Sequence, residues 1–177
     1  MIRYINLITV LRIILAPIIL LCMFIGNYKI SIFLFFLASV SDYLDGYLAR
    51  KFEAESELGE ILDPIADKIL VVFLLIGLTI ILDSFLIGVL SSFIISREIL
   101  VTALRDYASR QGYSHKIKVT FLAKIKTSIQ LFSIGLYLFA LAISFNLLLV
   151  ICDIFLMIAT IITLYTGFEY YINIFKK

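Results

Sequence analysis

Long apolar segments separated by short polar links constrain this chain more than any other feature. Six segments of this kind follow one another along the sequence, each rich in Leu, Ile, Val and Phe. A bilayer's hydrocarbon core is about 30 Å thick, so a helix needs ~20 apolar residues to cross it. Charged residues make up only 16% of the 177 residues and hydrophobic ones 63%, which is atypical of a soluble domain. The sequence therefore predicts an all-α, polytopic membrane protein that forms a single domain over residues 1–177.

Turn residues and charged links set the predicted helix boundaries. Gly26-Asn27 and Asp83-Ser84 are typical of tight turns, and two longer polar links cover residues 51–57 and 109–118. Pro17 lies inside the first segment, where it removes a backbone hydrogen bond and can kink a helix. The six predicted transmembrane helices cover residues 4–25, 28–50, 58–82, 85–107, 119–144 and 145–174.

The distribution of charge predicts the orientation of the chain. Alternating crossings put both termini and both longer links on one side, which collects nearly all the Lys and Arg, whereas the opposite turns hold only Lys29. The positive-inside rule then makes the basic side cytoplasmic. We expect a multi-pass protein of the plasma (inner) membrane with both termini and the active site in the cytoplasm. A net charge of +2 gives no indication of nucleic-acid binding.

Four carboxylates interrupt the second and third apolar segments. Asp42 and Asp45 are three residues apart, and Asp63 and Asp67 are four apart, so each pair shares a helix face. A short link is expected to bring the two faces together as an antiparallel hairpin. Ionisable groups at membrane depth usually mark a functional site, and carboxylate oxygens prefer hard cations. The short Asp side chain cannot snorkel far to water, so these charges are poorly explained as groups that merely reach the membrane surface. The array therefore predicts a site for two Mg²⁺ ions, with Mn²⁺ as an alternative.

Small residues accompany these carboxylates. Gly46, Ala49 and Gly59 leave space for a ligand or for a neighbouring helix, and Arg50 can meet a phosphate or an acidic neighbour. The full pattern is Asp42-x2-Asp45-Gly46-x2-Ala49-Arg50-x8-Gly59-x3-Asp63-x3-Asp67.

This pattern resembles the signature of the CDP-alcohol phosphotransferases at all eight fixed positions and in every gap. The resemblance implies transfer of a substituted phosphate from a CDP-linked lipid to an alcohol, with release of CMP. It implies that Asp42, Asp45 and Asp63 are metal ligands, and that Asp67 binds the second metal and acts as the base. It also suggests a homodimer. The residues that it places around the nucleotide are Asp42, Gly46, Ala49, Arg50 and Gly59.

A second cluster of charge is basic. Arg97 and Arg105 are eight residues apart, about two helical turns, and so lie on one face of the fourth helix. One interpretation is a pocket for an anion, since guanidinium groups suit phosphate oxygens. The alternative is that Arg97 forms a structural ion pair with Glu98 or Asp106. The six basic residues of the cluster are Arg97, Arg105, Lys116, Lys118, Lys124 and Lys126.

Three further segments resemble the branch of the family that uses sn-glycerol 3-phosphate as acceptor and CDP-diacylglycerol as donor. They are Asn6-Leu-Ile-Thr9-x2-Arg12-x4-Pro17, Arg97-Glu98-x6-Arg105 and Lys124-Ile-Lys126-Thr127. The resemblance implies that the acceptor phosphate is bound by Thr9, Arg12, Arg97, Arg105, Lys124 and Lys126.

Two alternatives remain open at this point. Another branch of the family could use inositol phosphate, serine or phosphatidylglycerol as acceptor. A divalent-cation transporter could use the carboxylates as a filter, although such a filter favours acidic groups near the bilayer midplane or in rings.

Overall fold

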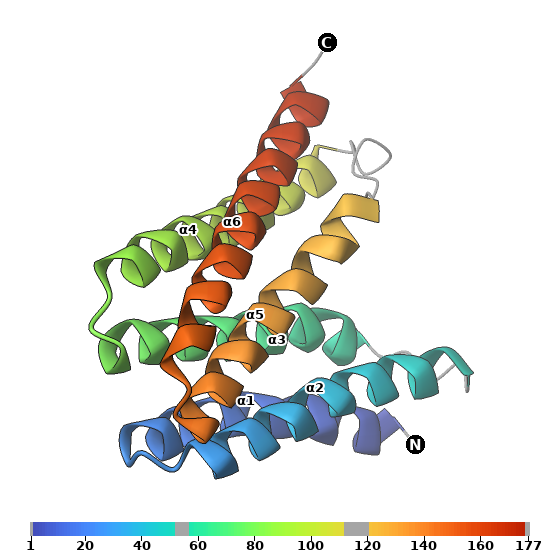
Figure 1. Ribbon diagram of the computed structural model, residues 1–177. Helices are drawn as coiled ribbons and strands as arrows, with labels where there is room; N and C mark the ends of the chain where they lie inside the picture. Colours follow the sequence, from blue (N-terminus) through green and yellow to red (C-terminus); the bar gives the residue numbers. More distant parts are fainter. Residues whose placement is uncertain (1, 52–56, 112–120, 176–177) are drawn as a thin grey trace.

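Six helices form in the part of the chain that the structure describes. The computed structural model describes residues 2–51, 57–111 and 121–175, and at 2–8, 42–51, 57–61, 63 and 121–124 it describes the backbone only. Within these ranges all regular secondary structure is helical (Figure 1). Every helix bound lies within three residues of its predicted position, the largest difference being the extension of the fourth helix to Arg110. The helices are α1 (Ile2–Phe24), α2 (Tyr28–Lys51), α3 (Glu57–Ile81), α4 (Phe85–Arg110), α5 (Phe121–Ile143) and α6 (Asn146–Phe175).

Tight turns join the helices at one end of the bundle. Gly26 takes a positive φ of 80° between α1 and α2, a conformation that glycine adopts without steric cost. Asp83 takes a φ of 44° between α3 and α4, and the side chain of Ser84 then accepts a hydrogen bond from the Ile87 N–H as the N-cap of α4. Both turns predicted from these residues are confirmed.

The helices have the length and the surface of membrane-spanning segments. Stretches long and apolar enough to cross a bilayer occur in α3 (Pro64–Ile81), α4, α5 (Ile125–Ile143) and α6. The apolar stretches described in α1 and α2, Thr9–Phe24 and Tyr28–Ser41, are shorter. Large apolar side chains are exposed along the outside, including Phe36 at 64% and Phe168 at 65%. Such a surface is suited to lipid tails rather than water.

The six helices pack as a closed ring. Following the most extensive contacts, α1 packs on α2, α2 on α5, α5 on α6, α6 on α4, α4 on α3, and α3 on α1. The expected hairpin therefore takes a different form in the described residues: α2 and α3 are both held by α1, and contact between these two is at most marginal. A short link makes two helices antiparallel, but it does not make them nearest neighbours.

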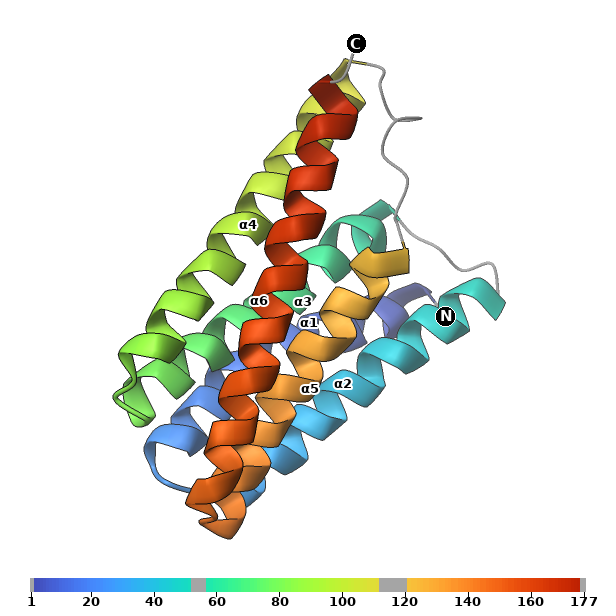
Figure 2. The same cartoon turned by 45° about the horizontal axis from the view of Figure 1, so that its top comes forward.

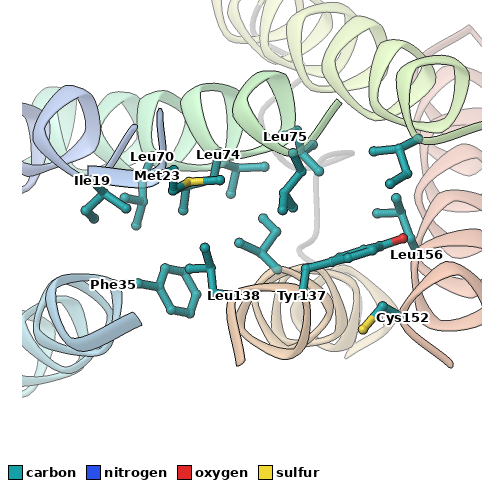
Figure 3. Packing of buried hydrophobic residues seen from close by; sticks show 14 of the residues in the cluster. Ile19, Met23, Phe35, Leu70, Leu74, Leu75, Tyr137, Leu138, Cys152 and Leu156 are labelled. Carbon is teal, nitrogen blue, oxygen red and sulfur yellow. The ribbon is translucent and has the colours of Figure 1, made fainter. Parts of the chain in front are cut away.

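A buried apolar cluster occupies part of the interior of the ring. Side chains from α1, α2, α3, α5 and α6 point into a common interior (Figure 3). The helices α1 and α3 approach closely at Gly77, where an added Cβ atom would lie 2.5 Å from Cδ1 of Leu20. Helix α1 continues through Pro17, and α3 through Pro64. The labelled cluster members in Figure 3 are Ile19, Met23, Phe35, Leu70, Leu74, Leu75, Tyr137, Leu138, Cys152 and Leu156.

One end of the bundle gathers the segments that carry the charged motifs. Figure 2 shows the start of α1, the end of α2, the starts of α3 and α5 and the ends of α4 and α6 on the same side of the molecule. The aspartate positions at the end of α2 and the start of α3 therefore lie on the same side as the basic residues of α4 and α5. The tight turns form the opposite end.

Candidate active site

A cavity of about 430 Å³ opens inside the ring on the side that carries the charged motifs. Side chains of α1, α2, α3, α4 and α5 form its wall. Because these five helices meet only through the tertiary fold, the cavity brings together motifs that are far apart in the sequence. The charged side chains that line it are Arg12, Asp67, Lys68, Arg97, Glu98, Arg105 and Lys126.

Asp67 lies on the α3 wall of the cavity with Arg12 of α1 beside it. Nη1 of Arg12 donates to Oδ1 of Asp67 at 2.5 Å, and the Arg12 side chain is fully buried. The Asp67 side chain is 45% exposed, so an ion or a substrate in the cavity can reach its carboxylate. A charge-assisted bond to a buried guanidinium fixes the orientation of this group. The predicted base is therefore part of the cavity, and Arg12 contacts it directly.

The other three predicted metal ligands lie in the expected helices. Asp42 and Asp45 belong to α2 and Asp63 to α3, one turn before Asp67, but their side chains fall outside the described part of the structure. Of the four carboxylates, Asp67 is therefore the one whose described side chain can be compared with the requirements of a bound cation. Its partly exposed carboxylate on a cavity wall is an oxygen donor of the kind that Mg²⁺ prefers.

Glu98 joins two of the predicted acceptor-binding residues. Its Oε1 atom accepts from Nη1 of Arg97 at 3.2 Å and is also in contact with Nζ of Lys126. All three side chains are largely buried, so each charge depends on the others for compensation. Glu98 therefore ties α4 to α5 on the cavity wall.

Arg97 forms a structural ion pair and also faces the cavity, so both roles considered from the sequence, ion pairing and anion binding, are compatible with its position. The structural ion pair with Glu98 is confirmed, whereas Asp106 pairs with the exposed Arg110 at 2.9 Å. Arg97 also lines the cavity, and its Nη2 atom donates to Oγ1 of Thr166 on α6 at 2.9 Å. A guanidinium held from two sides and facing a cavity is suited to binding an anion.

Arg105 lines the same wall two turns further along α4. Its Nη2 atom donates to the phenolic oxygen of Tyr170 at 2.8 Å. The guanidinium carbon also lies 5.0 Å from the centroid of the Tyr170 ring. Arg105 and Arg97 therefore both face the cavity and both contact α6.

Lys68 is a cavity residue that the sequence analysis did not single out. Its Nζ atom donates to Oγ1 of Thr102 at 2.6 Å, and Thr102 in turn donates to the backbone oxygen of Glu98. Its position directly after Asp67 in an apolar run was a usable signal, because a cation at that depth requires a partner. With Lys68 included, the described wall carries five cationic and two anionic side chains, a surplus of three positive charges.

The remaining predicted site residues either do not line the cavity or lie outside the side chains that the structure describes. Thr9 is fully buried on α1, one turn before Arg12, and is not among the residues that line the cavity. For Gly46, Ala49, Arg50, Gly59 and Lys124 the structure describes the backbone only, in α2, α3 or α5. Lys116 and Lys118 fall outside the described ranges.

Comparison with known proteins gives one consistent result. A family model described as CDP-alcohol phosphatidyltransferase matches residues 4–165. A protein of Haemophilus influenzae is 34% identical over 165 residues, covering 92% of this chain and 88% of that protein. A protein of Rickettsia felis is 35% identical over 173 residues, covering 94% and 92%. A protein of Rickettsia bellii is 36% identical over 170 residues, covering 94% and 92%. All three relatives are named CDP-diacylglycerol–glycerol-3-phosphate 3-phosphatidyltransferase.

Proposed function

The chain belongs to the CDP-alcohol phosphatidyltransferase family, and on that premise we propose that it is a phosphatidylglycerophosphate synthase. It transfers the phosphatidyl group of CDP-diacylglycerol to sn-glycerol 3-phosphate, giving phosphatidylglycerophosphate and CMP. The observation that carries this proposal is the cavity whose described wall holds Asp67 together with the guanidinium and ammonium groups of α1, α3, α4 and α5. The names of the relatives support the same reaction.

The grouping of basic side chains on the α4 and α5 part of the described cavity wall supports an acceptor that carries a phosphate. Phosphate monoesters carry between −1.5 and −2 charges at about neutral pH. Arg97, Arg105 and Lys126 line one cavity, and a dianion there would offset much of their charge. An acceptor with no net charge, such as the zwitterion serine, would add no net negative charge beyond that of Glu98.

Asp67 is suited to the role of general base in this reaction. The acceptor hydroxyl oxygen forms a bond to the phosphorus of the lipid-bearing phosphate, the bond from that phosphorus to CMP breaks, and Asp67 takes the hydroxyl proton. Arg12 holds the carboxylate toward the cavity, which spares a reorientation during the reaction.

We propose that Asp42, Asp45, Asp63 and Asp67 hold two Mg²⁺ ions, or Mn²⁺ in their place. When bound, the ions neutralise the diphosphate of the donor and stabilise the leaving phosphate. Gly46, Ala49, Arg50 and Gly59 would then border the cytidine nucleotide, together with Asp42.

Removing divalent metal is expected to abolish CMP release. With excess EDTA, purified protein should lose turnover, because four carboxylates can no longer bind the donor diphosphate through metal. Adding Mg²⁺ or Mn²⁺ beyond the chelator should restore it. Full turnover in EDTA, with the metal content measured by atomic absorption, would contradict the metal assignment.

The cytoplasmic orientation is supported by the basic side of the bundle. A test uses a protein in which Cys22 and Cys152 have been replaced, with one cysteine introduced at Gln111 or at Lys29. A membrane-impermeant maleimide applied to intact spheroplasts should label Lys29→Cys and not Gln111→Cys. The reverse pattern would overturn the orientation.

We propose that the protein forms a homodimer, and a candidate interface is the surface around a second cavity, of about 770 Å³, between α3 and α4 near the tight turns. Of its small lining residues, Gly88 and Ser91 pack within the chain, where an added Cβ atom at Gly88 would lie 3.1 Å from Cγ2 of Thr79, whereas Ser92 is exposed and can meet a neighbouring helix. Oxidation of a Ser92→Cys variant in membranes should produce a cross-linked dimer. A monomer that persists after complete thiol oxidation would argue against this interface.

An acceptor panel tests the proposed substrate. Purified protein with CDP-diacylglycerol and Mg²⁺ is offered glycerol 3-phosphate, inositol phosphate, serine and phosphatidylglycerol in competition, and the lipid products are separated. We expect phosphatidylglycerophosphate to dominate. A neutral acceptor that outcompetes glycerol 3-phosphate would overturn the assignment of the basic wall.

A further inference from the structure

Helix α6 contacts the cavity's arginines without joining the described part of the cavity wall. The lining residues come from α1 to α5, whereas Thr166 and Tyr170 of α6 hold Arg97 and Arg105 by their guanidinium groups. We propose that Thr166, Gly167 and Tyr170 are positioning residues that aim the two guanidinium groups at the acceptor phosphate. They would thereby set the preference for a phosphate-bearing acceptor. This inference rests on the proposed function.

The three α6 residues form one buried face. Positions 166, 167 and 170 are spaced i, i+1 and i+4, so they lie on the same side of the helix. All three are buried, and Tyr170 is only 4% exposed. The packing of α6 on α4 directs this face at the basic residues.

The absence of a side chain at Gly167 allows Arg97 to lie flat against α6. An added Cβ atom at this position would stand 2.9 Å from Cγ and 3.1 Å from Nε of Arg97. Contacts as short as 2.9 Å force a displacement, here of the arginine that the hydroxyl of Thr166 holds at 2.9 Å. Glycine at 167 is therefore matched to the placement of Arg97.

Tyr170 holds both arginines at once. Its hydroxyl accepts from Nη2 of Arg105, and its ring centroid lies 5.0 Å from the guanidinium carbon of Arg105 and 6.0 Å from that of Arg97. The negative face of an aromatic ring attracts cations, which offsets the repulsion between two like charges held side by side. One tyrosine thus keeps two guanidinium groups near each other in the absence of an anion.

If α6 fixes the two guanidinium groups before the acceptor binds, it should affect acceptor binding more than the chemical step. An anion that meets preorganised guanidinium groups loses less free energy in ordering them. If α6 provides this order, its loss raises the KM for glycerol 3-phosphate, while kcat and the KM for CDP-diacylglycerol change little. If the α6 residues had a merely structural role, their loss would instead impair kcat and both KM values together, or reduce the yield of folded protein.

The test compares Tyr170→Phe with Tyr171→Phe, a matched change at the adjacent, half-exposed position. We expect Tyr170→Phe to raise the KM for glycerol 3-phosphate about tenfold, because a hydrogen bond to a charged group is lost. Tyr171→Phe should match the wild type. A parallel pair, Thr166→Val and Thr166→Ser, should show the same rise for valine and rescue by serine, which keeps the hydroxyl.

The outcomes separate the inference from the proposed function. If the wild type releases CMP with glycerol 3-phosphate but Tyr170→Phe and Thr166→Val keep the wild-type KM for it, the positioning role is wrong and the function stands. Equal losses in every kinetic parameter would likewise overturn it. If folded wild type shows no turnover with glycerol 3-phosphate, the proposed function fails, and this inference fails with it.

Discussion

Replacing Asp67 with asparagine is expected to abolish CMP release while largely sparing metal binding. Asparagine keeps the size of the side chain and an oxygen that can accept from Arg12, so the local packing is retained. It cannot take the proton of the acceptor hydroxyl, and general-base catalysis contributes about 10² to 10⁴ in rate. Turnover is measured by CMP release, and metal binding by Mn²⁺ titration followed by electron paramagnetic resonance.

The control for this change is Asp83→Asn. Asp83 lies in the tight turn between α3 and α4 with a φ of 44°, a conformation that asparagine also tolerates. The variant should therefore keep wild-type turnover and metal binding. If Asp67→Asn lost turnover and metal binding in equal measure, the loss of metal alone would explain the loss of turnover, and the assignment of Asp67 as the base would be contradicted.

Replacing Arg97 with glutamine is expected to lower kcat/KM for glycerol 3-phosphate by about 10². The change removes the charge that faces the cavity, and it also weakens the bonds to Glu98 and Thr166 that orient the wall. Lys126 remains beside Glu98, so that carboxylate keeps a partner and folding is expected to survive. Steady-state kinetics with each substrate varied in turn measure the effect.

Arg110→Gln is the matched control on the same helix. Arg110 is 76% exposed and pairs with Asp106 at the surface, so its loss should leave the kinetics unchanged. A rise in the KM for CDP-diacylglycerol, with that for glycerol 3-phosphate unaffected, would place Arg97 in the donor site and contradict the assignment.

The features of the fold that depend on neighbouring residues in the sequence could be predicted. Apolar runs of membrane-spanning length and the turns at Gly26 and Asp83 determine the helices, because both depend on neighbouring residues alone. The order of helices around the ring could not be predicted. It depends on how side chains such as Leu20 fit against Gly77, which no periodicity within one segment records.

The site, like the fold, could be predicted where single residues stand out in the sequence and not where helix packing decides. Asp67, Arg97 and Arg105 stood out because charge in an apolar run is costly and needs a reason. Thr166 and Tyr170 carried no such signal, since neither side chain is charged and a threonine hydroxyl in a helix commonly bonds to its own backbone, as that of Thr166 does to the carbonyl oxygen of Ile162. Their role became visible only when α6 was seen against α4.

The central claim is tested most directly by CMP release from purified protein with CDP-diacylglycerol, Mg²⁺ and glycerol 3-phosphate. We expect CMP to appear only when both substrates are present, with one phosphatidylglycerophosphate formed for each CMP. Absence of CMP from folded protein under these conditions, or release that does not depend on glycerol 3-phosphate, would contradict it.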